Sequence, residues 1–264
     1  MKSPALMSAH GGRCTLVGAG PGDPELLTIK AARAIAQASV LFVDDLVNPA
    51  VLEHAAPDAR IVQVGKRGGC KSTPQAFIHK LMVQAVQAGE NVVRLKGGDP
   101  FIFGRGGEEV EHLRAQGITV QVLNGITAGL AGLTSLGAPL THRDHAHGVV
   151  FVTGHAKPGD AGTDWVALSY TARQAKLTLV IYMGVSSLHS IQSGLLQGLP
   201  ANTPVAIVQH ASLPQQREAL TTLGQLVHTM VSEGLQSPSI IVVGDVVQGA
   251  RAWQAQTVAA RHAA

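Results

Sequence analysis

The sequence is poor in aromatic residues and in cysteine, and it contains no long apolar run. Only 3% of its 264 residues are aromatic, which argues against a protein that reads nucleic-acid bases by stacking. Its two cysteines, Cys14 and Cys70, form no CxxC pair and no disulfide framework, so we expect a reduced, cytoplasmic setting. No segment approaches the roughly 18 uninterrupted apolar residues of a membrane span, and we expect no membrane association.

Charged residues are also scarce, at 14% of the chain, and their signs nearly balance. Lys and Arg number 20 and Asp and Glu number 17, giving a net charge of +3. Nucleic-acid-binding proteins concentrate far more basic charge on one face, so we expect no nucleic-acid partner. A mild basic excess suits a small anionic ligand equally well. The 45% hydrophobic content excludes a disordered chain.

The first half of the chain alternates short apolar runs with segments of helical periodicity. We predict helices over residues 24–38, 74–87 and 106–116, and strands over residues 14–17, 40–43, 60–64, 91–95 and 118–123. Strands separated by helices form parallel βαβ units, so this half predicts an α/β domain with a mainly parallel sheet.

The second half is less regular and predicts a mixed sheet. Strands at residues 204–209 and 217–222 follow one another without a helix, and residues 157–175 read as irregular. We therefore predict five segments: a tail over 1–12, an N-terminal α/β domain over 13–124, an interdomain segment over 125–147, a C-terminal α/β domain over 148–250 and a tail over 251–264.

Glycine is abundant, at 30 residues, and a first glycine-rich loop spans residues 17–24 (VGAGPGDP) between a strand and a helix. A dinucleotide fingerprint, GxGxxG, would need glycine at Asp23, and an acid there would face the pyrophosphate. Pro21 and Pro24 also remove backbone donors. A neutral or cationic nucleoside therefore fits this loop better than a phosphate, although a nicotinamide-dependent oxidoreductase using Asp44 is an alternative.

A second glycine-rich loop spans residues 94–109 (RLKGGDPFIFGRGGEE) and holds five glycines. It has no Walker A pattern. Gly97 and Gly98 leave room for a ligand against the main chain, and Asp99 can accept hydrogen bonds from an amine or a ribose. Loops at the carboxyl ends of parallel strands are the usual binding site of α/β folds, so we interpret this loop as a ligand site.

These two loops and further blocks in the same order resemble the tetrapyrrole methylase family. The further blocks are residues 64–67 (VGKR), 125–128 (GITA), 139–144 (PLTHRD), 182–184 (YMG) and 238–244 (PSIIVVG). The resemblance covers residues 14–247. It implies two α/β domains with the active site in the cleft between them, a homodimer, S-adenosylmethionine as the methyl donor and uroporphyrinogen III as the acceptor. Two successive methylations would give precorrin-2, for siroheme or cobalamin synthesis.

The resemblance also assigns site residues. It implies acid–base roles for Asp44 and Lys66, and it implies donor contacts from Pro21, Gly97, Gly98, Asp99, Ile102, Thr127, Ala128, Met183 and Ala211. Basic side chains that can hold the acceptor's carboxylates through charge-assisted bonds include Arg67, Arg105 and Arg143.

Several alternatives stay open. Asp44 can be a solvated loop acid or a helix cap, Lys66 can bind substrate carboxylates, and Met183 can fill a core. Another precorrin methylase on the same fold is a second possible activity. Methyl transfer from a sulfonium requires alignment and no metal, and the spacing of His142, His145 and His147 is not that of a zinc motif.

Two positions depart from the family pattern. Asn124 stands where the family usually has Pro before Gly-Ile-Thr-Ala, and Asp45 stands where it usually has Arg after the aspartate. We expect Asp45 to alter the electrostatic field around Asp44.

Overall fold

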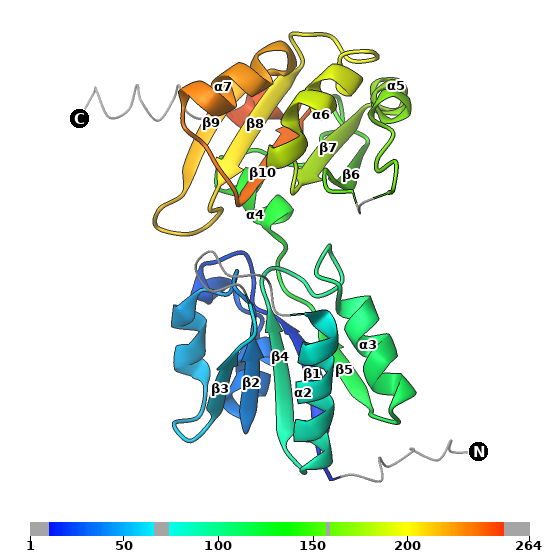
Figure 1. Cartoon of the computed structure of the whole chain (residues 1–264). Coiled ribbons are helices and arrows are strands. Elements are labelled where there is room, and N and C mark those ends of the chain that lie inside the picture. Colours follow the sequence, from blue (N-terminus) through cyan, green and yellow to red (C-terminus); the bar gives the residue numbers. More distant parts are fainter. Residues whose placement is uncertain (1–10, 66–73, 157–158, 251–264) are drawn as a thin grey trace, which may run out of the picture. The chain divides into compact units, whose positions relative to one another are not determined.

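The computed structural model describes residues 11–65, 74–156 and 159–250, and its chain divides into two compact units, Met1–Thr127 and Ala128–Ala264 (Figure 1). Each unit contains one five-stranded sheet with helices. The sequence prediction of two α/β domains, one with a parallel and one with a mixed sheet, is confirmed.

The sheet of the first unit is parallel throughout, in the order β3-β2-β4-β1-β5. Its strands are β1 (Arg13–Gly18), β2 (Val40–Val43), β3 (Arg60–Gln63), β4 (Asn91–Lys96) and β5 (Val120–Leu123). Its α-helices are α1 (Ile29–Ala36), α2 (Gln75–Gln87) and α3 (Gly106–Ala115), and two 3₁₀ helices are η1 (Pro24–Leu26) and η2 (Pro49–His54).

Helices cover both faces of this sheet. On one face, Leu16, Phe42 and Val92 pack in a core with residues of α2 and α3. On the other face, the neighbouring strand residues Val17 and Val93 pack in a core with residues of α1 and η2. Because successive strand residues point to opposite faces, strands buried on both sides read as continuous apolar runs, as the sequence shows.

The helix predicted over residues 24–38 is wrong as a single element. Asp23 caps η1 by accepting a hydrogen bond from Glu25 N at 2.9 Å. Leu27 and Thr28 then adopt extended backbone, and Thr28 Oγ1 caps α1 by accepting from Ala31 N at 3.1 Å. The capping side chain starts a new helix although the helical spacing of apolar residues continues across it.

The sheet of the second unit has the order β6-β7-β10-β8-β9, with β6 and β7 parallel and the other neighbours antiparallel. Its strands are β6 (Gly148–Thr153), β7 (Leu177–Tyr182), β8 (Pro204–Gln209), β9 (Arg217–Thr222) and β10 (Ser239–Val243). Its helices are α4 (Ala128–Thr134), α5 (Trp165–Ala175), η3 (Val185–Ser187), α6 (Leu188–Leu195), η4 (Leu223–Gln225) and α7 (Leu226–Ser232).

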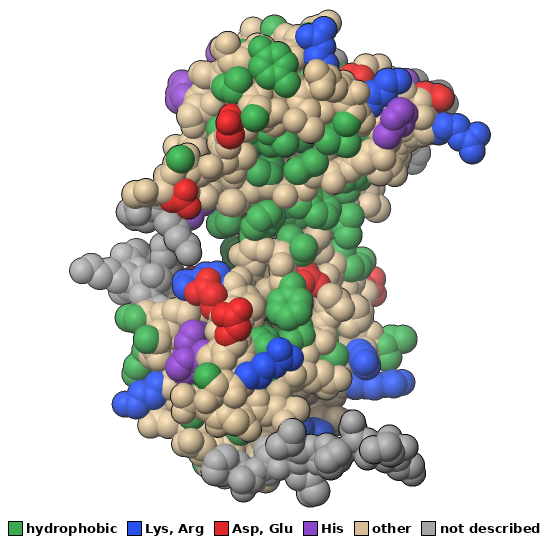
Figure 2. Space-filling model, turned by 90° about the vertical axis from the view of Figure 1, so that its right-hand side faces the viewer, with side chains coloured by type: hydrophobic (Ala, Val, Ile, Leu, Met, Phe, Trp, Pro, Cys, Tyr) green, Lys and Arg blue, Asp and Glu red, His purple; other side chains and the backbone are tan. Residues whose placement is uncertain are grey.

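The reading of residues 157–175 as irregular is wrong, because α5 occupies their second part. Asp164 caps this helix by accepting from Ala167 N at 2.9 Å. Trp165, Leu168 and Ala172 lie at helical spacing and face the core of the second unit, while most of the other residues of the helix are exposed. Among the described residues, every helix is too short or too polar to cross a membrane. Lys and Arg side chains lie scattered over the face of the molecule seen in Figure 2.

Candidate functional site

The carboxyl ends of β1, β4 and β5, which are neighbours in the first sheet, bring three loops together. Gly98 N donates to Gly20 O at 2.7 Å and Gly20 N donates to Gly98 O at 3.2 Å, so the first and second glycine loops are joined by main chain. A Cβ on Gly18 would lie 2.4 Å from Gly125 N, and a Cβ on Gly125 would lie 2.2 Å from Gly98 O. These glycines are therefore required by the close packing of three backbones.

Gly97 and Gly98 have separate structural reasons to be glycine. Gly98 has φ of 66°, in the left-handed region that favours glycine. A Cβ on Gly97 would lie 2.8 Å from Leu46 Cβ. A bulky residue at Gly98 would therefore strain the backbone.

Asp99 fastens the second loop to the loop after β5. The residue is 6% exposed, and its Oδ1 accepts from Phe101 N at 2.8 Å. Its Oδ2 accepts from Gly125 N and from Asn124 Nδ2, each at 3.1 Å. The departure to Asn124 therefore supplies a hydrogen bond that a Pro at this position could not make.

Asp44 follows β2 at the same edge of the sheet, and two buried cations of β4 lie beside it. Asp44 Oδ2 lies 3.4 Å from Arg94 Nη2 and 3.8 Å from Lys96 Nζ. The Asp44 side chain is 36% exposed, so this carboxylate is reached by solvent while the cations behind it are not. Asp44 is therefore held beside two cations and is not a freely solvated loop acid.

Glu109, in the first turn of α3, is the counter-charge of both cations and is fully buried. Arg94 Nε lies 3.0 Å from Glu109 Oε1, and Lys96 Nζ lies 3.2 Å from Glu109 Oε2. Gln75 Nε2, from α2, also donates to Glu109 Oε1 at 2.9 Å. Burial, and next the positive charge of Arg94, lower the pKa of Lys96.

The sequence reasoning assigned no role to Arg94, Lys96 or Glu109. The sequence did contain a sign of their role, namely charged residues at the end of a predicted apolar strand. Arg94 and Lys96 alternate with Leu95 directly after the apolar pair Val92 and Val93, and charged side chains buried in such a strand need a partner.

Other predicted residues of the first unit lie in or beside these loops. Pro21 and Ile102 are half-buried, and Thr127 is buried. Arg105, which is exposed, donates from Nε to Glu108 Oε1 at 2.9 Å at the start of α3, and this hydrogen bond raises the pKa of Arg105. Lys66 and Arg67 lie outside the described residues.

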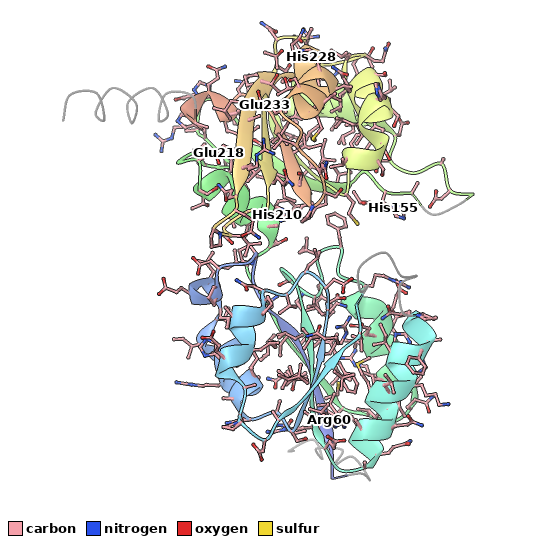
Figure 3. The ribbon with its side chains drawn as sticks, turned by 60° about the vertical axis from the view of Figure 1, so that its left-hand side comes forward. Arg60, His155, His210, Glu218, His228 and Glu233 are labelled. Atoms are coloured by element: carbon pink, nitrogen blue, oxygen red, sulfur yellow. The ribbon has the colours of Figure 1, made fainter. Side chains whose placement is uncertain are left out.

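In the second unit, β6, β7 and β8 run in the same direction, and their carboxyl ends meet at one edge of the sheet. Met183 follows β7 with φ of 53° and is 47% exposed. The alternative that Met183 fills a hydrophobic core is therefore wrong. His210 and the buried Ala211 follow β8, and His155 lies just after β6 (Figure 3).

Two further predicted residues of the second unit lie outside this edge. Ala128 begins α4, which packs against β7, β8 and β10. Arg143 is exposed in the loop before β6. In that loop the rings of His142 and His145 stack with centroids 4.6 Å apart. Across the described ranges, no group of three or more His, Cys, Asp or Glu side chains is placed to hold a metal ion.

Residues 13–227 match the model of one protein family, described as Tetrapyrrole (Corrin/Porphyrin) Methylases. The chain belongs to this family. The assignment made from the ordered motifs is thereby confirmed.

Relatives of this tetrapyrrole methylase share most of its length. It is 53% identical over 238 residues to a uroporphyrinogen-III C-methyltransferase from Pseudomonas aeruginosa, covering 90% of this chain and 95% of the relative. It is 48% identical to a siroheme synthase from Azotobacter vinelandii, covering 90% of this chain but 50% of that longer protein.

The methylase is also similar to a solved structure from Thermus thermophilus, of uroporphyrin-III C-methyl transferase complexed with S-adenyl homocysteine. The TM-score is 0.75 and the sequence identity is 40%, and the match covers 89% of this chain and 93% of the other.

Proposed function

We propose that the chain is an S-adenosylmethionine-dependent C-methyltransferase that converts uroporphyrinogen III to precorrin-2 by two successive methylations. The observation that carries this proposal is the 53% identity to a uroporphyrinogen-III C-methyltransferase across nearly the whole of both chains. The product would enter siroheme or cobalamin biosynthesis, and the similarity to siroheme synthases supports the first of these routes.

We propose that the donor binds against the main chain of the loops that follow β1, β4 and β5. Pro21, Gly97, Gly98, Asp99 and Ile102 are the contacts there, joined by Thr127, Ala128, Met183 and Ala211. The donor carries no phosphate. This suits a first loop where Asp23 caps η1, because a capping carboxylate already occupies the place at a helix N-terminus where a phosphate would bind. The same contact argues against the nicotinamide alternative.

Methyl transfer from S-adenosylmethionine needs little catalysis by side chains, because the positively charged sulfur is already a good leaving group. The nucleophile is an electron-rich pyrrole carbon of the acceptor, and the protein must align the two centres. After methylation a proton leaves the macrocycle, and we propose Asp44 as its acceptor. Lys66 is proposed as its acid–base partner, and Arg67, Arg105 and Arg143 as cations for the acceptor's carboxylates.

The decisive experiment incubates the purified full chain with S-adenosylmethionine and uroporphyrinogen III under anaerobic conditions. We expect a product whose mass has risen by two CH2 units, because each transferred methyl group replaces one proton. Intact binding of S-adenosylhomocysteine without methyl incorporation would refute the acceptor assignment. Asp44→Asn should lower kcat by about 100-fold or more, the scale of general-base catalysis, while Asp58→Asn, at an exposed acid of the same unit, should not.

We also propose that the enzyme is a cytoplasmic homodimer. The cysteine-poor composition suits the cytoplasm, and the dimer is what the family resemblance implies. Light scattering after size-exclusion chromatography tests the dimer, and a mass equal to one chain at micromolar concentration would contradict it.

A further inference from the structure

Four charged side chains form one connected group at the carboxyl end of β4, and we refer to Asp44, Arg94, Lys96 and Glu109 as the Glu109 cluster. Three of them are removed from water: Arg94 is 1% exposed, Lys96 is 3% exposed and Glu109 is fully buried. Only the Asp44 side chain is substantially exposed. The cluster holds two cations and two carboxylates, so its charges balance.

The position of the cluster is costly for the fold. Arg94 pairs in register with Leu16 of β1 and Phe42 of β2, both fully buried apolar residues. Taking charges out of water is expensive, and apolar side chains of similar volume are often as stable or more stable at such places. Stability alone therefore does not account for charges inside this core.

The contacts of the cluster form a chain that runs from Glu109 on α3, through the two cations of β4, to the exposed Asp44 carboxylate. Glu109 receives Arg94 on Oε1 and lies within 3.2 Å of Lys96, and Gln75 fixes the same carboxylate from α2. Arg94 is held further by donating from Nη1 to Phe42 O at 3.3 Å and to Leu95 O at 3.2 Å. Both cations then present a nitrogen to the same atom, Asp44 Oδ2.

We infer that Glu109 and Lys96 are positioning residues, which with Arg94 hold the Asp44 carboxylate in a fixed orientation beside two positive charges. This inference rests on the proposed role of Asp44 as proton acceptor. The negative charge of Glu109 offsets the repulsion between the two cations, and both cations lie close to one oxygen of Asp44. Within the described residues, both ion-pair contacts of Asp44 are made by Oδ2, and we assign the proton to the other oxygen, Oδ1.

The charged groups around Asp44 come from several elements. Arg94 and Lys96 face it from β4, and Glu109 stands behind them on α3. Asp45 follows it in the chain and lies against Gly65, the residue before Lys66. Behind Glu109, His79 on α2 lies 3.2 Å from Gln75 Nε2.

The test uses two variants whose electrostatic effects on Asp44 have opposite signs. Lys96→Met removes a positive charge beside Asp44, so protonation of the base should begin at higher pH and the acid limb of the kcat profile should move upward. Glu109→Gln removes a negative charge behind the cations, so the acid limb should move downward. A merely structural role predicts no such opposition.

We further expect Lys96→Met to lower kcat about tenfold or more at neutral pH, with the KM for S-adenosylmethionine within about threefold of wild type. Lys96→Arg keeps the charge and should restore the position of the acid limb. Matched controls are Lys80→Met and Glu111→Gln, which change exposed residues of α2 and α3 and should behave as wild type.

Folding of each variant is checked by its thermal melt and by S-adenosylhomocysteine affinity. Should Glu109→Gln fail to fold, the comparison of Lys96→Met with Lys96→Arg still decides the question. Folded variants with a wild-type kcat and pH profile, or with limbs that move in the same direction, would overturn the inference. A wild-type kcat in Asp44→Asn would instead overturn the proposed role of Asp44 itself.

Discussion

Asp99 offers a sharp test of how the glycine loops are held together. Its carboxylate receives three donors: the backbone N–H groups of Phe101 and Gly125 and the side-chain amide of Asn124. Asp99→Ala removes the two bonds from Asn124 and Gly125, which join the loop after β5 to the loop after β4, and the bond from Phe101 within the loop after β4. We expect both loops to open more readily and donor binding to fall.

The magnitude follows from the burial of each partner. A hydrogen bond to a charged group contributes about 1.5–3 kcal/mol, and the half-buried Gly125 N–H should lose close to the full amount. Phe101 and Asn124 are exposed, so water partly replaces their bonds and each loss is about 1 kcal/mol or less. The free energy of opening these loops should therefore fall by about 2–5 kcal/mol, a large share of a typical domain stability of about 5–15 kcal/mol.

The measurement has to report on the first unit. All four Trp and Tyr residues lie after residue 127, so intrinsic fluorescence follows the second unit. Hydrogen–deuterium exchange of peptides spanning residues 97–106 and 120–127 is the suitable assay, together with calorimetric titration of S-adenosylhomocysteine.

Two milder variants should give smaller losses of loop stability than Asp99→Ala. Asp99→Asn keeps one acceptor oxygen and should lose about half as much, and Asn124→Ala removes a single exposed bond and should lose about 1 kcal/mol or less. Unchanged exchange protection of these peptides together with unchanged ligand affinity in Asp99→Ala would refute the role of Asp99 as a fastening between the loops.

Three further predictions follow from single residues. Gly125→Ala should abolish calorimetric binding of S-adenosylhomocysteine, because the new Cβ would lie 2.2 Å from Gly98 O, whereas Gly107→Ala adds a Cβ with nothing within 4 Å and should bind normally. Burial lowers the pKa of His79 below its ordinary 6.5, so the unfolded chain binds the proton more readily and stability should decline as pH falls below about 6.5. Thermal melts over this range should show a smaller decline in His79→Leu, and an identical decline would contradict the assignment. Burial raises the pKa of the Cys14 thiol to about 12, so iodoacetamide at about pH 8 should label it only after unfolding, as peptide mass spectrometry can show.

Much of the fold could be predicted because the strands of a parallel sheet are buried on both faces, and their sequences are therefore continuous apolar runs. All four residues of β2 are buried, and they read as an uninterrupted apolar run. Helix α5 was missed although Trp165, Leu168 and Ala172 have helical spacing, because this apolar stripe is only three residues long and the rest of the helix is exposed or polar. The break between η1 and α1 was missed because a single capping side chain, Thr28, overrides a continuing pattern.

The glycine loops could be located from the sequence, but not the reason for their glycines. The sequence reasoning assigned the space beside Gly98 to a ligand, whereas in the structure Gly20 and Gly125 come close to its backbone. These contacts join residues far apart in the chain. They depend on β1 lying between β4 and β5, an order that motif spacing does not contain.

In the Glu109 cluster, too, some contacts could be predicted from local sequence patterns, and one depends on how distant strands pair. Strand alternation places Arg94 and Lys96 on the face of Val92, which packs against α2 and α3. Helical periodicity then selects Glu109 over its exposed neighbour Glu108, because Glu109 lies with the buried Val110 and Leu113. The buried ion pairs follow from these two local rules. The approach of Asp44 does not, because only the pairing of β2 with β4 brings it to the cations, and the inferred positioning of Asp44 depends on that pairing.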